Sequence, residues 1–213
     1  MSLPAENRFS VPEFFTFLSV SQEKWELVDG VPVMMAGATQ RHQDVAANLL
    51  AFLHQRLRGS GCRPTGSDTG VLTGDASVRY PDLVVDCGPR HDESMHATKP
   101  TVVIEVLSPS TRGFDSHLKL IEYKGNTDIR QVLLVDTVTP RVLVHRRDGE
   151  IWREEILTGL EGVIDLPDIR TELPMADVYD GIEFGPRLVG RAPCEQCGKS
   201  PCVCETGIDG PDV

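Results

Sequence analysis

The sequence predicts an α/β domain in which helices flank a mixed β-sheet. Residues 79–86 and 100–107 form short apolar runs rich in Val, Ile and Leu, which are typical of buried strands. Residues 40–57 carry an apolar stripe at helical spacing, which predicts a long helix packed on the sheet. A helical segment at 115–123 separates the strands predicted at 100–107 and 131–136, and such a crossover makes those two strands parallel.

Length and composition are those of one globular domain. The chain has 213 residues, of which 40% are hydrophobic and 25% are charged, so it can bury a sizeable core. No apolar run approaches ~20 residues and no basic segment followed by an apolar one opens the chain, so we expect neither a membrane span nor a secretory signal. A cytoplasmic protein is therefore expected. We place the domain at residues 11–185 and a separate Cys-rich tail at 191–213.

The N-terminal elements follow from local patterns. Residues 11–18 predict a short amphipathic helix. Two strands, at 24–28 and 31–35, flank Asp29-Gly30, which predicts a hairpin because both turn positions favour positive φ. The next elements are a helix and two strands, predicted at 40–57, 70–73 and 79–86.

Beyond the crossover helix, the chain predicts an antiparallel extension of the sheet. Thr139-Pro140 and Asp148-Gly149 are turn sequences, and strands joined by such short turns pair antiparallel. The later elements are strands at 131–136, 141–147, 151–156 and 162–166, and a short helix at 175–182.

Two carboxylates interrupt the apolar runs. Asp82 lies in the first run and Glu105 in the second. An ionised carboxylate in an apolar setting costs several kcal/mol unless it is paired, hydrogen-bonded or bound to a metal. Because side chains alternate along a strand, the two carboxylates converge if their strands are neighbours. The pair therefore predicts a functional site.

The following helix adds a cation. Asp115, Lys119 and Tyr123 are spaced four residues apart and share one helix face. Leu118 and Ile121 are available to dock this helix on the sheet. Carboxylate oxygens are ligands that Mg²⁺ or Mn²⁺ prefers, and such an ion acidifies a water and neutralises charge on a phosphodiester. A nearby lysine orients that water or stabilises the transition state.

These motifs resemble those of a known family. In chain order they are Pro81-Asp82, Glu105-Val-Leu-Ser108, Asp115, Lys119, Tyr123 and the strand Val132-Leu-Leu-Val-Asp136. This order is similar to that of the Uma-type "putative restriction endonuclease" family of the PD-(D/E)xK nuclease superfamily. The resemblance extends upstream to residues 25–30 and His42 and covers roughly residues 11–180. It implies a restriction-endonuclease-like core.

The resemblance also implies roles for individual residues. Asp82 and Glu105 would hold Mg²⁺ or Mn²⁺, and the peptide carbonyl of Val106 would complete the coordination. Lys119 would position the attacking water. Asp115 and Tyr123 would support Lys119, and Glu26 and His42 are outer candidates. For Glu26, a solvent-facing strand residue is an equally open interpretation. A lone inward histidine is more often a satisfied structural residue than a catalytic one, so His42 is a secondary site candidate that rests on the family pattern.

One position departs from the superfamily pattern. The usual third motif places a lysine two residues after the acidic residue, where this chain has Leu107. A leucine supplies no cation, so the resemblance assigns that role to Lys119 on the following helix.

The net charge of −11 opposes nucleic-acid binding, because such proteins usually present Lys and Arg to the phosphates. The tail from Arg191 holds two basic and four acidic residues, so the body still carries −9. A local basic patch stays open, although cations also complement a helix C-terminus and often line edge strands. The candidates are His54, Arg56, Arg58 and Arg63 at one helix end, and Arg141, His145, Arg146 and Arg147 on a late strand.

The tail is rich in cysteine. Four cysteines fall within eleven positions, namely Cys194, Cys197, Cys202 and Cys204. In a chain without a secretion signal this spacing favours a zinc site of the knuckle type over disulfides, and the alternative is a redox-sensitive tail. Cys62 and Cys87 lie in the body and are expected to be free thiols.

The sequence therefore predicts a Mg²⁺- or Mn²⁺-dependent endonuclease, with structural Zn²⁺ in the tail. Its expected partner is nucleic acid, with DNA as the first expectation, and not a membrane. Nuclease homodimers are common, but no exposed apolar stripe declares an interface. The competing hypothesis is a catalytically inert binding or scaffold protein that keeps the nuclease fold, with the tail as an interaction module.

Overall fold

The computed structural model describes residues 8–108 and 114–185, without the side chains of residues 114–116. The chain divides into two compact units, residues 1–182 and 183–213, and the elements below belong to the first. The side chain of Asp115 lies outside the described residues. So do the four predicted zinc ligands, Cys194, Cys197, Cys202 and Cys204.

A six-stranded mixed sheet carries the core, in the order β10-β9-β8-β7-β6-β3. Its strands are β3 (Arg63–Gly66), β6 (Leu83–Asp86), β7 (Pro100–Leu107), β8 (Gln131–Asp136), β9 (Arg141–Asp148) and β10 (Ile151–Thr158). β7 and β8 are parallel, and the other neighbours are antiparallel. This topology confirms the predicted α/β class, the crossover and its antiparallel extension.

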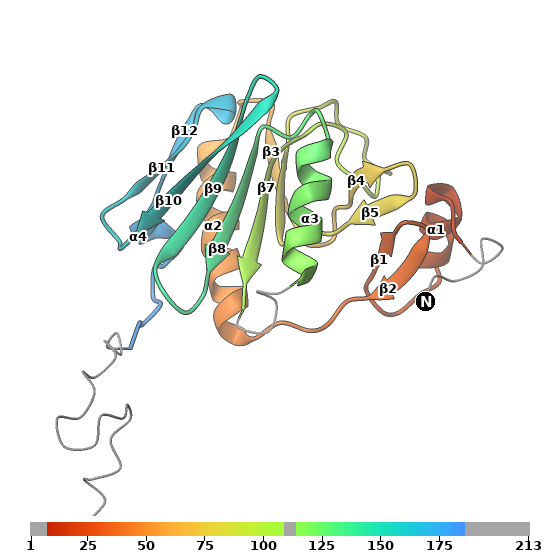
Figure 1. Cartoon of the computed structure of the whole chain (residues 1–213), viewed down its shortest axis with the longest axis horizontal. Coiled ribbons are helices and arrows are strands. Elements are labelled where there is room, and N and C mark those ends of the chain that lie inside the picture. Colours follow the sequence, from red (N-terminus) through yellow and green to blue (C-terminus); the bar gives the residue numbers. More distant parts are fainter. Residues whose placement is uncertain (1–7, 109–113, 186–213) are drawn as a thin grey trace, which may run out of the picture. The chain divides into compact units, whose positions relative to one another are not determined.

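Two helices, α2 (Gln40–Arg56) and α3 (Phe114–Gly125), cover opposite faces of this sheet (Figure 1). The hydroxyl of Thr39 accepts the N–H of His42 and caps the start of α2. The predicted apolar stripe of α2 is buried, as shown by Val45, Leu49 and Leu53. Over the described ranges, no helix is long and apolar enough to cross a membrane.

α3 packs through a different face from the one predicted. Ile121 is 55% exposed, whereas Tyr123 is fully buried and Leu120 packs against the same core cluster. Residues 120 and 123 are one turn apart and so face the sheet together, which turns residue 121 outward. The docking role predicted for Ile121 was wrong. This orientation also buries Lys119 against the sheet.

A smaller four-stranded sheet, in the order β2-β1-β5-β4, packs beside α3. Its strands are β1 (Trp25–Val28), β2 (Val31–Met34), β4 (Val71–Gly74) and β5 (Ser77–Arg79), and α1 (Val11–Leu18) lies against it (Figure 1). Asp29 and Gly30 have φ values of 48° and 77°, which confirms the predicted hairpin turn.

The sequence predicted one strand over residues 79–86, and this prediction was wrong. Arg79 ends β5 in the small sheet, and Leu83 begins β6 in the large one. Pro81 lies at the break, where a residue without an N–H cannot donate to a strand ladder. Asp82 therefore sits where the chain passes from one sheet to the other.

The last elements form a small antiparallel pair and a short helix. They are β11 (Val163–Leu166), the 3-10 helix η2 (Pro167–Ile169), β12 (Thr171–Pro174) and α4 (Met175–Val178). The predicted strand at 162–166 is confirmed, and the final helix is shorter than predicted.

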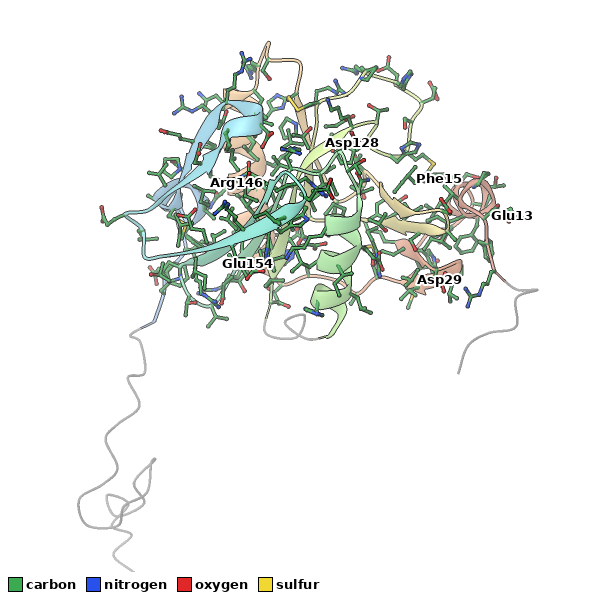
Figure 2. All side chains as sticks on the ribbon, turned by 45° about the horizontal axis from the view of Figure 1, so that its top comes forward. Glu13, Phe15, Asp29, Asp128, Arg146 and Glu154 are labelled. Atoms are coloured by element: carbon green, nitrogen blue, oxygen red, sulfur yellow. A yellow bond between two sulfur atoms is a disulfide. The ribbon has the colours of Figure 1, made fainter. Side chains whose placement is uncertain are left out.

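Cys62 and Cys87 form a disulfide, seen as a yellow bond in Figure 2, so the expectation of two free thiols was wrong. Cys62 immediately precedes β3 and Cys87 immediately follows β6. These two strands are antiparallel neighbours, so the pairing of distant segments brings the thiols together. Sequence spacing alone carries no such information.

Reduction of this disulfide should lower the free energy of unfolding. The bond closes a loop with a sequence separation of 25. Closing a loop of that size lowers the conformational entropy of the unfolded chain, which stabilises the folded state by about 3.5 kcal/mol. Urea unfolding with and without reductant measures the change. The Cys62→Ser/Cys87→Ser variant is the control, since reductant should then have no effect, and an equal effect in this variant would contradict the prediction.

Candidate active site

Asp82 and Glu105 meet at adjoining ends of β6 and β7. The register pairs Leu83 with Ile104, so the residues just beyond this pair, Asp82 and Glu105, lie side by side. Asp82 Oδ2 accepts the N–H of Val106 at 2.7 Å, which fixes the carboxylate against β7. The structure thus brings together the two carboxylates that the sequence singled out, although Asp82 precedes its strand.

Glu105 is nearly inaccessible, with 9% of its surface exposed. The hydroxyl of Tyr123 donates to its Oε1 at 2.7 Å. Burial raises the pKa of Glu105 to about 7, while the charge of Lys119 opposes the rise and that of Asp82 adds to it. Its environment therefore favours a nearby positive charge.

Lys119 supplies one such charge from α3. Its Nζ lies 2.8 Å from Glu26 Oε1 and 3.7 Å from Glu105 Oε1, and the residue is only 9% exposed. A lysine from the helix thus reaches the Glu105 carboxylate, whereas Leu107, at the usual position of the lysine, offers no cation. Glu26 is buried beside it, which rules out a solvent-facing Glu26.

His42 enters from the start of α2. Its Nε2 lies 3.2 Å from Asp82 Oδ2. The hydrogen bond to Asp82 raises the pKa of His42 against the effect of burial. His42 is therefore in contact with one of the two candidate ligands, and its other ring nitrogen has no hydrogen-bond partner among the described residues.

Arg79 and Glu122 complete the cluster. Arg79 Nη1 donates to Glu26 Oε2 at 3.0 Å, and two further donors of Arg79 bind both oxygens of Glu122 at 2.7 Å each. Four carboxylates then face two basic side chains, which leaves a formal charge of −2 with His42 neutral. A divalent cation would balance that charge.

A pocket of about 370 Å³ opens onto this cluster. Its polar lining includes Glu26, His42, Asp82, Glu105 and Lys119, and residues 33–38 form an apolar wall. Within the described ranges, no group of three or more His, Cys, Asp or Glu residues is assembled to hold a metal. Mg²⁺ commonly takes only one or two protein carboxylates plus waters and substrate oxygens, so the pair Asp82 and Glu105 fits that ion.

Comparison with known proteins connects the chain to a family. The Uma2 family, described as "Putative restriction endonuclease", matches residues 11–176. The chain belongs to the Uma2 family. Two uncharacterized proteins of Synechocystis sp. are each 30% identical to it, one over 182 residues (83% of this chain, 94% of the relative) and one over 144 residues (66% and 80%). The predicted resemblance is thereby confirmed.

A solved structure supports the fold assignment of this Uma2 chain. It is a crystal structure described as a putative nuclease belonging to DUF820 from Anabaena variabilis. The TM-score is 0.64 at 17% identity, covering 80% of this chain and 97% of that one. At this identity the likeness shows a shared fold.

Arg79 and Glu122 of this Uma2 chain were not predicted from the sequence to belong to the site. Glu122 follows Lys119 by three residues, a spacing that would have placed both on one helix face. Arg79 was read as part of an apolar strand, and only the small sheet reveals its partners. A charged residue beside an apolar run was the available signal.

The two predicted basic patches differ in their exposure and in their neighbours. His54, Arg58 and Arg63 line a second cleft, of about 590 Å³, next to the disulfide. On β9, His145 is only 1% exposed and cannot contribute to a surface patch. Figure 2 shows Arg146 and Glu154 on the neighbouring β9 and β10 strands, so acidic side chains accompany the basic ones there.

Proposed function

We propose that this Uma2 protein is a metal-dependent endonuclease that hydrolyses phosphodiester bonds in nucleic acid, with DNA as the expected substrate. The observation that carries the proposal is the buried contact of Lys119 with the carboxylates of Glu26 and Glu105. It supplies, from a helix, the cation that Leu107 cannot supply. The description of the family and of the Anabaena structure as putative nucleases agrees with this chemistry.

Asp82, Glu105 and the peptide carbonyl of Val106 are the groups proposed to hold Mg²⁺ or Mn²⁺. Asp82 is oriented by the Val106 N–H and by His42, and Glu105 by the Tyr123 hydroxyl. Hydrogen bonds of this kind from a second layer of residues fix ligand geometry and strengthen binding. When bound, the ion would acidify a water and offset charge on the phosphodiester.

Lys119 is proposed to orient the attacking water and to stabilise charge that develops on the phosphate. Its ammonium is held by Glu26, and both residues are buried in the lining of the pocket, where burial strengthens electrostatic interactions. Glu26 therefore keeps the lysine in place, and His42 keeps Asp82 in place. Tyr123 supports Glu105, while Asp115 retains the supporting role implied by the resemblance.

Cleavage of labelled single- and double-stranded DNA and RNA by the full chain tests the proposal. We expect cutting with Mg²⁺ or Mn²⁺ and none with EDTA. The Asp82→Asn protein, purified in parallel, is the matched control and should be inactive, since equal cleavage by this variant would reveal a contaminant.

The same experiment distinguishes the nuclease proposal from the competing hypothesis of an inert protein. If the wild type binds Mn²⁺ but cuts none of the four substrates under any condition, the nuclease assignment fails. The protein would then be a binding or scaffold protein that keeps the nuclease fold.

A further inference from the structure

Arg79 lies at the junction of the small sheet, α3 and the candidate site. Arg79 is only 1% exposed, and its guanidinium donates two parallel hydrogen bonds of 2.7 Å to Glu122. A third bond of 3.0 Å reaches Glu26 Oε2. Two-pronged pairing of this kind fixes geometry as well as charge, because the planar guanidinium matches the carboxylate.

Both partners of Arg79 lead to Lys119. Glu26 uses its other oxygen, Oε1, to accept the N–H of Tyr80 at 3.0 Å and to pair with Lys119 at 2.8 Å. Glu122 lies one turn after Lys119 on α3. Arg79 thus contacts the carboxylate that holds the lysine and the helix from which the lysine projects.

We propose that Arg79 is a positioning residue for Lys119, acting through Glu26 and Glu122. Its catalytic consequence rests on the proposed nuclease function. A lysine side chain has a flexible four-carbon stem, so a lysine that projects from a helix needs a fixed acceptor to hold its ammonium in one place. Arg79 fixes both the acceptor, Glu26, and the position of α3 relative to the small sheet. The four-stranded sheet thereby contributes to the geometry of the site.

Packing alone does not require this arrangement. α3 is also held by the buried Tyr123 and by Asn126, the residue that follows the helix, whose Nδ2 donates to the Leu72 carbonyl at 2.8 Å. A buried ion pair is weak evidence for stability, because desolvation offsets much of the attraction. Burial acts to raise the pKa of Glu122, yet the bonds from Arg79 bring that pKa below its ordinary value, so Arg79 stabilises the ionised form of Glu122.

The test compares three variants of the full chain. Arg79→Lys keeps the positive charge but loses the bidentate hydrogen bonds to Glu122. Glu122→Gln keeps Arg79 and weakens the same pair of hydrogen bonds. Asn126→Ala is the matched control, since it removes another contact between α3 and the small sheet without touching Glu26. Thermal unfolding shows whether each variant is folded. If Arg79→Lys does not fold, the measurements on Glu122→Gln decide the question.

Two measurements report on Lys119. The first is kcat and KM for metal-dependent cleavage, where Arg79→Lys should lower kcat by about 100-fold and change KM little, because a misplaced catalytic group acts on the chemical step. The second is the NMR resonance of the Lys119 ε-carbon in the metal-free protein. It should move toward that of exposed lysines in Arg79→Lys and stay unchanged in Asn126→Ala.

The outcomes are distinct. Wild-type kcat and an unmoved resonance in a folded Arg79→Lys protein would overturn the proposal. Equal losses in Asn126→Ala would also overturn it, since Arg79 would then only anchor the helix. If the wild type cuts nothing, the nuclease function fails by itself, and the resonance alone decides whether Arg79 positions Lys119.

Discussion

Replacing Lys119 by methionine should lower kcat for nucleic-acid cleavage by about 1,000-fold, because a positioned cation or proton donor commonly contributes that much. Methionine keeps much of the length and the apolar stem but removes the ammonium that lies 2.8 Å from Glu26 and 3.7 Å from Glu105. Single-turnover cleavage with saturating Mg²⁺ measures the effect on chemistry rather than on substrate binding.

A matched control lies on the same helix. Lys124 pairs with Glu154 at 3.3 Å on β10, outside the pocket lining, so Lys124→Met should leave kcat within about threefold of wild type. A similar loss of kcat in both variants would show that any lysine of α3 is needed for activity, and not Lys119 in particular. Thermal unfolding separates that case from a failure to fold.

Returning the lysine to its usual place offers a rescue. Leu107 lines the pocket two residues after Glu105, where the superfamily carries its lysine. The double variant Leu107→Lys/Lys119→Met should recover cleavage by about tenfold or more over Lys119→Met, since the same charge re-enters the site from β7. Absence of any recovery, in a folded protein, would argue against the equivalence of the two positions.

Glu105→Gln should weaken Mn²⁺ binding by at least about 100-fold and abolish cleavage, because a neutral amide replaces a negatively charged ligand. The substitution preserves shape, and the amide oxygen can still accept the Tyr123 hydroxyl. Isothermal titration with Mn²⁺ alone measures the affinity without any substrate. The matched control is Glu172→Gln at an exposed position of β12, and wild-type affinity in both proteins would remove Glu105 from the proposed ligand set.

The same substitution should stabilise the metal-free protein in alkaline solution. Burial raises the pKa of Glu105 from 4.5 to about 7, so the folded state holds this proton more tightly than the unfolded state does. Its contribution to stability is fully present below pH 4.5 and is lost as pH rises through about 7. In EDTA at pH 8, Glu105→Gln should therefore melt above wild type, and a lower Tm would contradict the assignment.

Local periodicity was sufficient for most of the fold. The continuous apolar runs of β7 and β8 reflect strands that are buried on both faces, and the helical stripe of α2 reflects the one face that packs on the sheet. Asp82 and Glu105 were recognisable because an ionisable group beside a run of Val and Ile is costly without a partner. Lys119 followed from its spacing on a helix face and from the family resemblance.

Other features depend on which segments meet in space. The run from Arg79 to Asp86 looks continuous in sequence, yet it passes from one sheet to another at Pro81. That break gives Arg79 and Asp82 different neighbours, so the partners of Arg79 could not be read from its own segment. The disulfide between Cys62 and Cys87 arises in the same way, from the pairing of β3 with β6.

The sequence by itself determined the class of fold and the residues whose burial needs explanation, because both follow from patterns within single elements. Only the tertiary structure decided how those residues are joined. Glu26, Lys119 and Arg79 come from three elements of two layers, and they interact because the small sheet packs beside α3. Charge interactions act through distances in space, which the order of residues along a chain does not specify.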